Sequence, residues 1–187
     1  MKLLDHPEIS QLEFKVTNDT YWNGKAQMPI ESAVILLKSS NSETKINYEE
    51  RTGEFTKVTI AGFVDQNIFA SKTKIKNPTI KSSFKISAIG SIEKIFNRNK
   101  SFKISTNNSE LKKLLSGSAL LKSIFKLVEN SSDLSPELSG NFENEANEYC
   151  IQINYVTKTR SEELIILMIK WIEEISTKIT TANSRLA

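Results

Sequence analysis

The chain has 187 residues and a formal net charge of +3, and 39% of its residues are hydrophobic. This length and composition suit a globular chain with a substantial core. The single cysteine, Cys150, excludes a disulfide. The single histidine, His6, leaves too few ligands for an ordinary zinc site and no well-placed base for a nucleophilic triad. Because the six glycines form no phosphate-binding loop, we expect no catalytic residue, no metal and no cofactor.

No apolar stretch is long enough to cross a membrane. The longest apolar runs, residues 33–37 and 164–169, are far shorter than the roughly 20 residues that a membrane-spanning helix needs. The first residues show no apolar stretch of signal-peptide length. We expect a cytoplasmic, bacterial protein without a membrane span.

The first hundred residues have the patterns of β-strands. Apolar and polar side chains alternate over residues 12–16 and 44–49, and the β-branched residues of 33–37 favour a short buried strand over a helical turn. A turn after residue 51 predicts a hairpin of 44–49 with 55–64. The clearest strand is 80–88, whose apolar residues all share one face. These patterns predict a sheet with one buried face.

A short sequence echo relates two of the expected strands. Ser-Phe-Lys-Ile-Ser occurs at residues 83–87 and again at 101–105. Nothing repeats over a longer period, so the chain is not a solenoid. We interpret the echo as two strands that have the same alternation of apolar and polar residues.

The second half of the chain changes to helical spacing. Leucines and other apolar residues recur every three or four positions over 109–128, and Gly117 weakens the middle of this helix or marks a bend or a close contact. Residues 130–140 have the composition of a loop, 149–156 alternate as a strand, and a wide apolar stripe predicts a last helix from about 162 to 178.

The order of elements indicates an α+β fold. A mostly antiparallel sheet from the N-terminal half carries two longer amphipathic helices from the C-terminal half. We expect one domain over residues 1–187. A subdivision near residue 107, into a β-rich unit of residues 1–106 and a helix–strand–helix unit of residues 107–187, stays open.

Charge is distributed unevenly along the chain. Residues 70–105 hold nine basic side chains and one acidic one, whereas residues 129–174 hold ten acidic and three basic ones. The basic strands could neutralise phosphates, could protect sheet edges from aggregation, or could simply face the acidic segment. Lysines outnumber arginines, which argues against planar phosphate recognition. The candidate residues for polyanion binding are Lys74, Lys81, Lys85 and Lys103.

An acidic cluster precedes the strand 149–156. Glu143, Glu145 and Glu148 could hold a divalent cation or act as an acid–base pair. Their spacing matches no calcium-binding loop, and a solvated strand end explains them more simply. The cluster leaves a carboxylate-dependent hydrolase as a further alternative.

The last helix is apolar around most of its circumference over residues 164–169. A helix that packs on one side of a sheet needs only one apolar stripe. The surplus residues Ile166, Ile169 and Trp171 are either an interface with another chain or are buried between the sheet and the helix 109–128. The sequence favours neither arrangement.

These observations predict a non-catalytic binding protein that acts through protein–protein interaction, as an adaptor or as an antitoxin-like inhibitor does. The expected partner is another protein or a second copy of the chain. The alternative is binding of nucleic acid or another polyanion through the lysine-rich strands 72–103. The charge distribution would steer either kind of partner.

Overall fold

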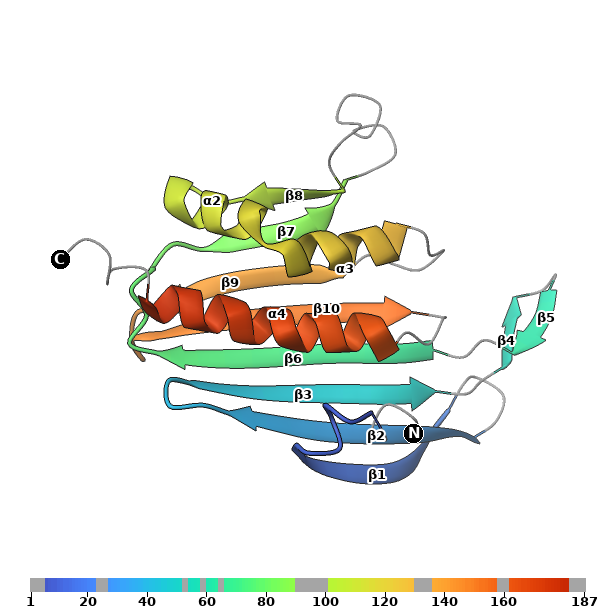
Figure 1. The fold of residues 1–187 in the computed structure, drawn as a ribbon. Coiled ribbons are helices and arrows are strands. Elements are labelled where there is room, and N and C mark those ends of the chain that lie inside the picture. Colours follow the sequence, from blue (N-terminus) through green and yellow to red (C-terminus); the bar gives the residue numbers. More distant parts are fainter. Residues whose placement is uncertain are drawn as a thin grey trace.

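The protein folds as one large sheet with helices on one of its faces (Figure 1). The structure is a computed structural model, and it describes residues 6–22, 27–51, 54–57, 60–63, 66–89, 101–129, 136–157 and 162–181. The predicted α+β fold is confirmed: the large sheet has eight strands, and every pair of neighbouring strands in it is antiparallel. No helix in these ranges combines the length and the apolar character that a membrane crossing requires.

The elements follow one another as β-strands, then two helices, then two strands and a last helix. The strands of the large sheet are β1 (Glu13–Trp22), β2 (Gln27–Lys38), β3 (Ser42–Arg51), β6 (Gln66–Lys76), β7 (Phe84–Ala88), β8 (Phe102–Ser105), β9 (Glu137–Glu143) and β10 (Glu148–Thr157). A separate two-stranded sheet consists of β4 (Glu54–Lys57) and β5 (Ile60–Phe63). The helices are α2 (Ser109–Gly117), α3 (Ala119–Glu129) and α4 (Glu162–Thr181).

The strands of the large sheet lie in the order β1-β2-β3-β6-β10-β9-β7-β8. β10 pairs with β6 on one side and with β9 on the other, so residues from both sides of position 107 form one sheet. The two strands that carry the sequence echo, β7 and β8, are neighbours, and Ile86 lies opposite Ile104. The two similar sequences thus form neighbouring strands of the same sheet.

Three predictions about strands are wrong in detail. Strand 44–49 does not form a hairpin with 55–64, because β3 pairs with β2 and β6 while β4 and β5 pair with each other. The strand predicted over 80–88 begins only at Phe84. β9 begins inside the predicted loop 130–140, because its pairing with β10 and β7 overrides a sequence rich in turn-forming residues.

The predicted helix 109–128 consists of two helices, α2 and α3. Asn108 caps α2, since its Oδ1 accepts a hydrogen bond from the backbone N–H three residues later at 2.8 Å. α2 ends at Gly117 because Ser118 has an extended backbone with φ −66° and ψ 119°. The Ser118 hydroxyl oxygen accepts a hydrogen bond from the first turn of α3, and the hydroxyl donates to Glu174 of α4 at 2.9 Å. Ser118 therefore sets the break between the helices and ties it to α4.

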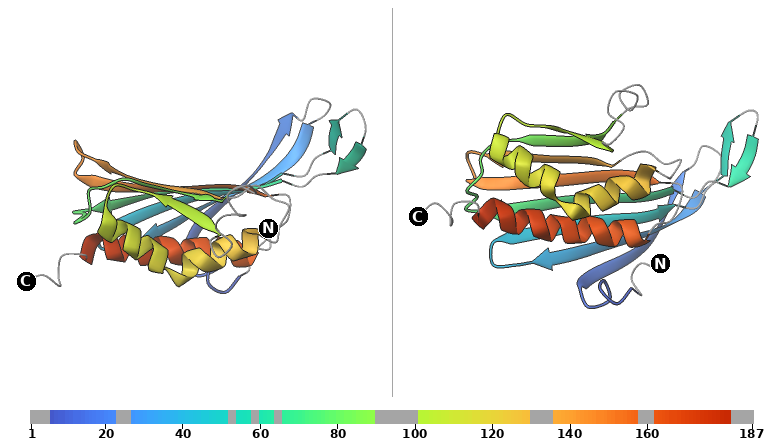
Figure 2. Two further views of the ribbon diagram at one scale, coloured as in Figure 1. Left: turned by 90° about the horizontal axis from the view of Figure 1, so that it is seen from above. Right: turned by 45° about the horizontal axis from the view of Figure 1, so that its top comes forward.

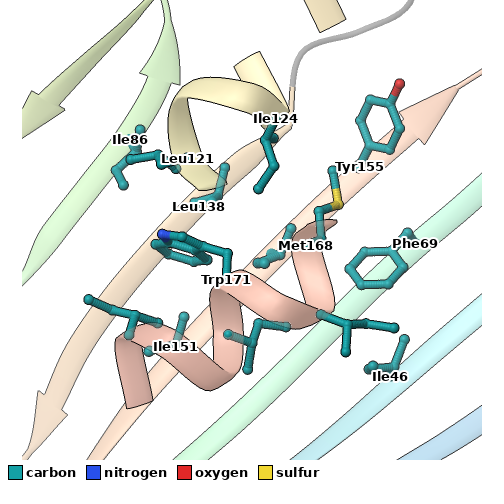
Figure 3. Packing of buried hydrophobic residues seen from close by; sticks show 14 of the residues in the cluster. Ile46, Phe69, Ile86, Leu121, Ile124, Leu138, Ile151, Tyr155, Met168 and Trp171 are labelled. Carbon is teal, nitrogen blue, oxygen red and sulfur yellow. The ribbon is translucent and has the colours of Figure 1, made fainter. Parts of the chain in front are cut away.

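The core lies between the sheet and the three helices. α4 lies over the middle strands of the sheet (Figure 1), and the side chains of Met168 and Trp171 point from it into the layer beneath (Figure 3). Met168 and Trp171 are fully buried there, and the Trp171 ring meets the Phe84 ring edge-on with centroids 6.4 Å apart. Burial of one such side chain stabilises the fold by about 1.5–3 kcal/mol. This helix is the main cover of the sheet.

One glycine allows two aromatic rings to pack over β9. Gly140 lies opposite both Phe84 and Ile151 in the neighbouring strands. The rings of Phe84 and Tyr149 stack with centroids 6.4 Å apart, and a Cβ at Gly140 would overlap the Phe84 ring and lie 2.7 Å from Tyr149 Cε1. A glycine is therefore required at this position for packing.

Candidate binding face

The two faces of the sheet have different environments. Successive side chains of a strand point to opposite faces, and one set, which includes Ile46, Phe69 and Ile151, is buried beneath the helices. The other set points away from the helices, and no described segment covers it. We call this second surface the open face. In the left view of Figure 2 the β9–β10 end and the β1–β2 end of the sheet bend away from the helices, which makes the open face concave along the strands.

The three candidate interface residues of the last helix are buried. Ile166 is 7% exposed, Ile169 is 6% exposed and Trp171 is fully buried. Of the two arrangements that the sequence allowed, the structure has the one in which these residues are buried, with α3 and the sheet packed against α4. We therefore place no interface on these residues.

Three of the four candidate polyanion-binding lysines lie on the open face. Lys74, Lys85 and Lys103 each alternate with side chains that pack beneath the helices. Lys81 lies apart from them, because it precedes β7 and its Nζ lies 5.0 Å from the centroid of the Phe142 ring. Phe142 pairs with Tyr149, whose side chain faces the helices. The structure thus places three of these lysines on the same face of the sheet and the fourth elsewhere.

Two directly opposite lysines of this face were not among the four candidate residues, although one of them belongs to the lysine-rich strands 72–103. Lys45 of β3 lies directly opposite Lys72 of β6, and both are exposed. Directly opposite residues have Cα atoms about 4.5–5.5 Å apart, and like charges there destabilise a sheet. Within the described residues, neither ammonium group has a carboxylate partner. The sequence predicted the alternation of 44–49, which lies in β3, but neither the bounds of β6 nor its pairing with β3.

The lysine pair belongs to a row of cationic and hydrogen-bonding side chains across five strands. In register, Lys45 is followed by Lys72 of β6, Gln152 of β10, Ser139 of β9 and Lys85 of β7. We call these five residues the lysine–amide band. Neighbouring strands are about 4.8 Å apart, so the band is roughly 19 Å long. No acidic residue belongs to it, and both of its ends carry positive charge.

Acidic residues of the open face lie on several strands, among them Asp19 of β1, Glu43 and Glu49 of β3, and Glu148 of β10. Lys74 Nζ lies 3.3 Å from Glu148 Oε2. This ion pair joins the basic segment 70–105 to the acidic segment 129–174. The hydrogen bond from Lys74 and the charge of Glu148 raise the pKa of the lysine above its usual 10.5. The predicted intramolecular pairing of the two segments is therefore present at Lys74, outside the lysine–amide band.

The lone cysteine lies beside the band. Cys150 lies opposite Lys74 in the pairing of β10 with β6 and is 5% exposed. Burial raises the pKa of its thiol, and the nearby charges of Lys72 and Lys74 only partly oppose this shift. The thiolate, which is the nucleophilic form, is therefore disfavoured at neutral pH. Its environment is that of a packing residue.

The acidic cluster sits at the end of the β9–β10 hairpin. Glu143 and Glu148 lie opposite each other, and Glu145 is exposed in the turn between them. Glu148 is already engaged by Lys74. Among the residues that the structure describes, no group of three or more histidine, cysteine or acidic side chains gathers in a way that could hold a metal ion.

Comparison of the chain with protein families, with curated proteins and with solved structures finds no match. Its function is therefore inferred from the geometry of this chain alone.

Proposed function

We propose that the protein is a non-catalytic binding protein whose open face binds an acidic surface of another protein. The observation that carries the proposal is the direct opposition of Lys45 and Lys72 in the lysine–amide band. Two adjacent ammonium groups without a carboxylate partner among the described residues repel each other in the free protein. An anionic partner that lies across them would relieve this repulsion and gain two charge-assisted hydrogen bonds.

The composition of the band favours a protein partner over nucleic acid. Its cations are all lysines, whereas bidentate recognition of phosphates relies on arginine. The band contains no aromatic side chain on which bases could stack. Gln152 and Ser139 instead offer donors and acceptors that suit peptide groups and carboxylates. The concave curve of the open face (Figure 2) would let a convex partner contact several strands at once.

Capture experiments with matched charge reversals test this proposal. The full chain and the double variant K45E/K72E would be immobilised and exposed to lysate of the native source, with and without nuclease. The control is K112E/K113E, which makes the same charge change on exposed residues of α2 in the helical layer. We expect a stoichiometric protein that the wild type and the control retain and that K45E/K72E loses.

Quantitative binding of that protein sharpens the test. We expect K45E/K72E to weaken the affinity at least about tenfold, because two favourable charge contacts become repulsive. Partners that disappear with nuclease would replace the protein partner with nucleic acid. Equal losses for K45E/K72E and K112E/K113E would show that net charge alone drives retention, which contradicts a site on the open face.

A further inference from the structure

In the part of the chain that the structure describes, one margin of the large sheet is a long strand with a neighbour on one side only. β1 pairs with β2 through ten consecutive residue pairs, from Glu13 opposite Leu36 to Trp22 opposite Gln27, and it is the first strand in the order of the sheet. The opposite margin differs, because β8 has only four residues and α2 follows closely after it (Figure 1). A long, regular edge strand is a template for pairing with another strand.

The side chains of this edge strand are exposed on both faces of the sheet. Every residue from 13 to 20 is exposed. Phe14 is 39% exposed and Val16 is 42% exposed. Among the described residues, these two are the exposed large hydrophobic side chains. They lie opposite Ile35 and Ala33, which are buried. The apolar layer of the core thus continues to the margin of the sheet and is partly exposed there.

The backbone shows which residues of β1 direct their polar groups outward. The N–H of Thr20 donates to the side chain of Asp19 at 2.7 Å. Thr20 lies opposite Pro29, which has no N–H, so this pair is one of the non-hydrogen-bonded pairs of the β1–β2 ladder. Because such pairs alternate along an antiparallel ladder, Phe14, Val16 and Asn18 also direct their N–H and C=O groups away from β2.

We infer that β1 pairs antiparallel with β1 of a second copy of this chain, with Thr17 facing Thr17 across a two-fold axis. A two-fold axis perpendicular to the sheet maps each face onto itself. In this register, residues 13 to 21 of the two copies are paired, and each Lys15 lies opposite Asp19 of the other copy on the open face. The outward groups of Phe14 and Val16 then meet those of Thr20 and Asn18, and the N–H of Thr20 exchanges its hydrogen bond with Asp19 for one with the Phe14 carbonyl of the other copy.

Charge selects this register from its neighbours. With Lys15 on the axis, two lysines would face each other. With Val16 on the axis, Glu13 would lie opposite Asp19 of the other copy. Opposite charges directly across a ladder stabilise it, whereas like charges destabilise it. The register centred on Thr17 therefore combines two favourable charge pairs with a long ladder, and it places the open faces of both copies on the same side.

A disulfide tests the register directly. Thr17 of one copy faces Thr17 of the other in a non-hydrogen-bonded pair. The Cα atoms of these two residues would therefore lie about 4.5 Å apart, within the range that a disulfide bridges. We expect T17C to form a disulfide-linked dimer on mild oxidation of the full chain, read on non-reducing gels. T20C is the matched control, because it is the same substitution on the same strand and Thr20 lies opposite Phe14 of the other copy, outside the charge pairs. The wild type, with Cys150 5% exposed, gives the background. Equal linkage of T17C and T20C, or linkage of neither, would overturn the inference.

A charge swap tests the same contact without crosslinking. Sedimentation of the wild type over a range of concentrations should show a monomer–dimer equilibrium. D19K should weaken the dimer about tenfold, because it replaces two attractive pairs with two repulsive ones. The double variant K15D/D19K restores opposite charges and should recover the wild-type affinity. A wild type that stays monomeric, or a dimer that D19K leaves unchanged, would contradict the inference.

Discussion

The two faces of the large sheet are made by the same strands but differ in what they contribute to the fold. The face under α2, α3 and α4 holds the large buried side chains, among them Phe69, Ile151 and Trp171. On the open face, the lysine–amide band holds lysine, amide and hydroxyl side chains, which gain little from folding. Alternate residues of one strand thus stabilise the fold, and the residues between them are left for the binding that we propose. Substitutions on the two faces should therefore have different consequences.

Loss of the largest buried side chain should have the largest effect on stability. Trp171 is fully buried, and its ring contacts Phe84. We expect W171A to lower the free energy of unfolding by about 3–5 kcal/mol, since it removes apolar burial and leaves a cavity. Denaturant unfolding measures this. A loss below about 1 kcal/mol would mean that α4 is not the main cover of the sheet.

Overpacking of the covered face should have the next largest effect. A methyl group at Gly140 would overlap the Phe84 ring and crowd Tyr149. We expect G140A to cost about 1–3 kcal/mol of unfolding free energy. The double variant G140A/F84L, whose side chain at position 84 is smaller, should lose less than the sum of the two single variants. Simple additivity would show that the two sites do not touch.

Removal of the α2 cap should have a smaller effect. Asn108 accepts the hydrogen bond of Leu111 N–H at 2.8 Å. We expect N108A to destabilise the fold by about 1 kcal/mol, which is typical of a lost N-cap. The neighbouring variant N107A, at an exposed position, is the control and should change stability by less than about 0.5 kcal/mol. Equal effects of both variants would contradict the capping role.

Neutralisation of one lysine in the open pair should have the smallest effect on stability. K72Q removes the repulsion between Lys72 and Lys45 and buries nothing. We expect a change within about 0.5 kcal/mol, in the stabilising direction. Denaturant unfolding at low salt measures it, because salt screens exposed charges. A clear destabilisation would show that Lys72 has a structural role and would break the distinction between the two faces.

The covered face was easier to predict from the sequence than the open one. The apolar stripe of the last helix and the alternation of 149–156 depend on local periodicity, so both were predicted close to their observed bounds. β9 was missed because Ser139, Gly140 and Asn141 resemble a loop. These residues form a strand because they pair with β10 and β7, and Gly140 leaves room there for two aromatic rings.

The lysine pair of the open face could not be predicted because it depends on strand order. Lys45 and Lys72 are separated along the chain by the β4–β5 hairpin, and only the antiparallel pairing of β3 with β6 brings them together. Local alternation gives the face of each lysine. It does not give the register between strands that are distant in sequence.

Lysine footprinting of the full chain, free and bound to the captured partner, tests the proposed binding face directly. Amine acetylation read by mass spectrometry reports the accessibility of each lysine. We expect Lys45, Lys72 and Lys85 to become protected in the complex, while Lys112 and Lys113 of α2 stay reactive. Protection of the α2 lysines with an unchanged open face would contradict a binding site on the open face.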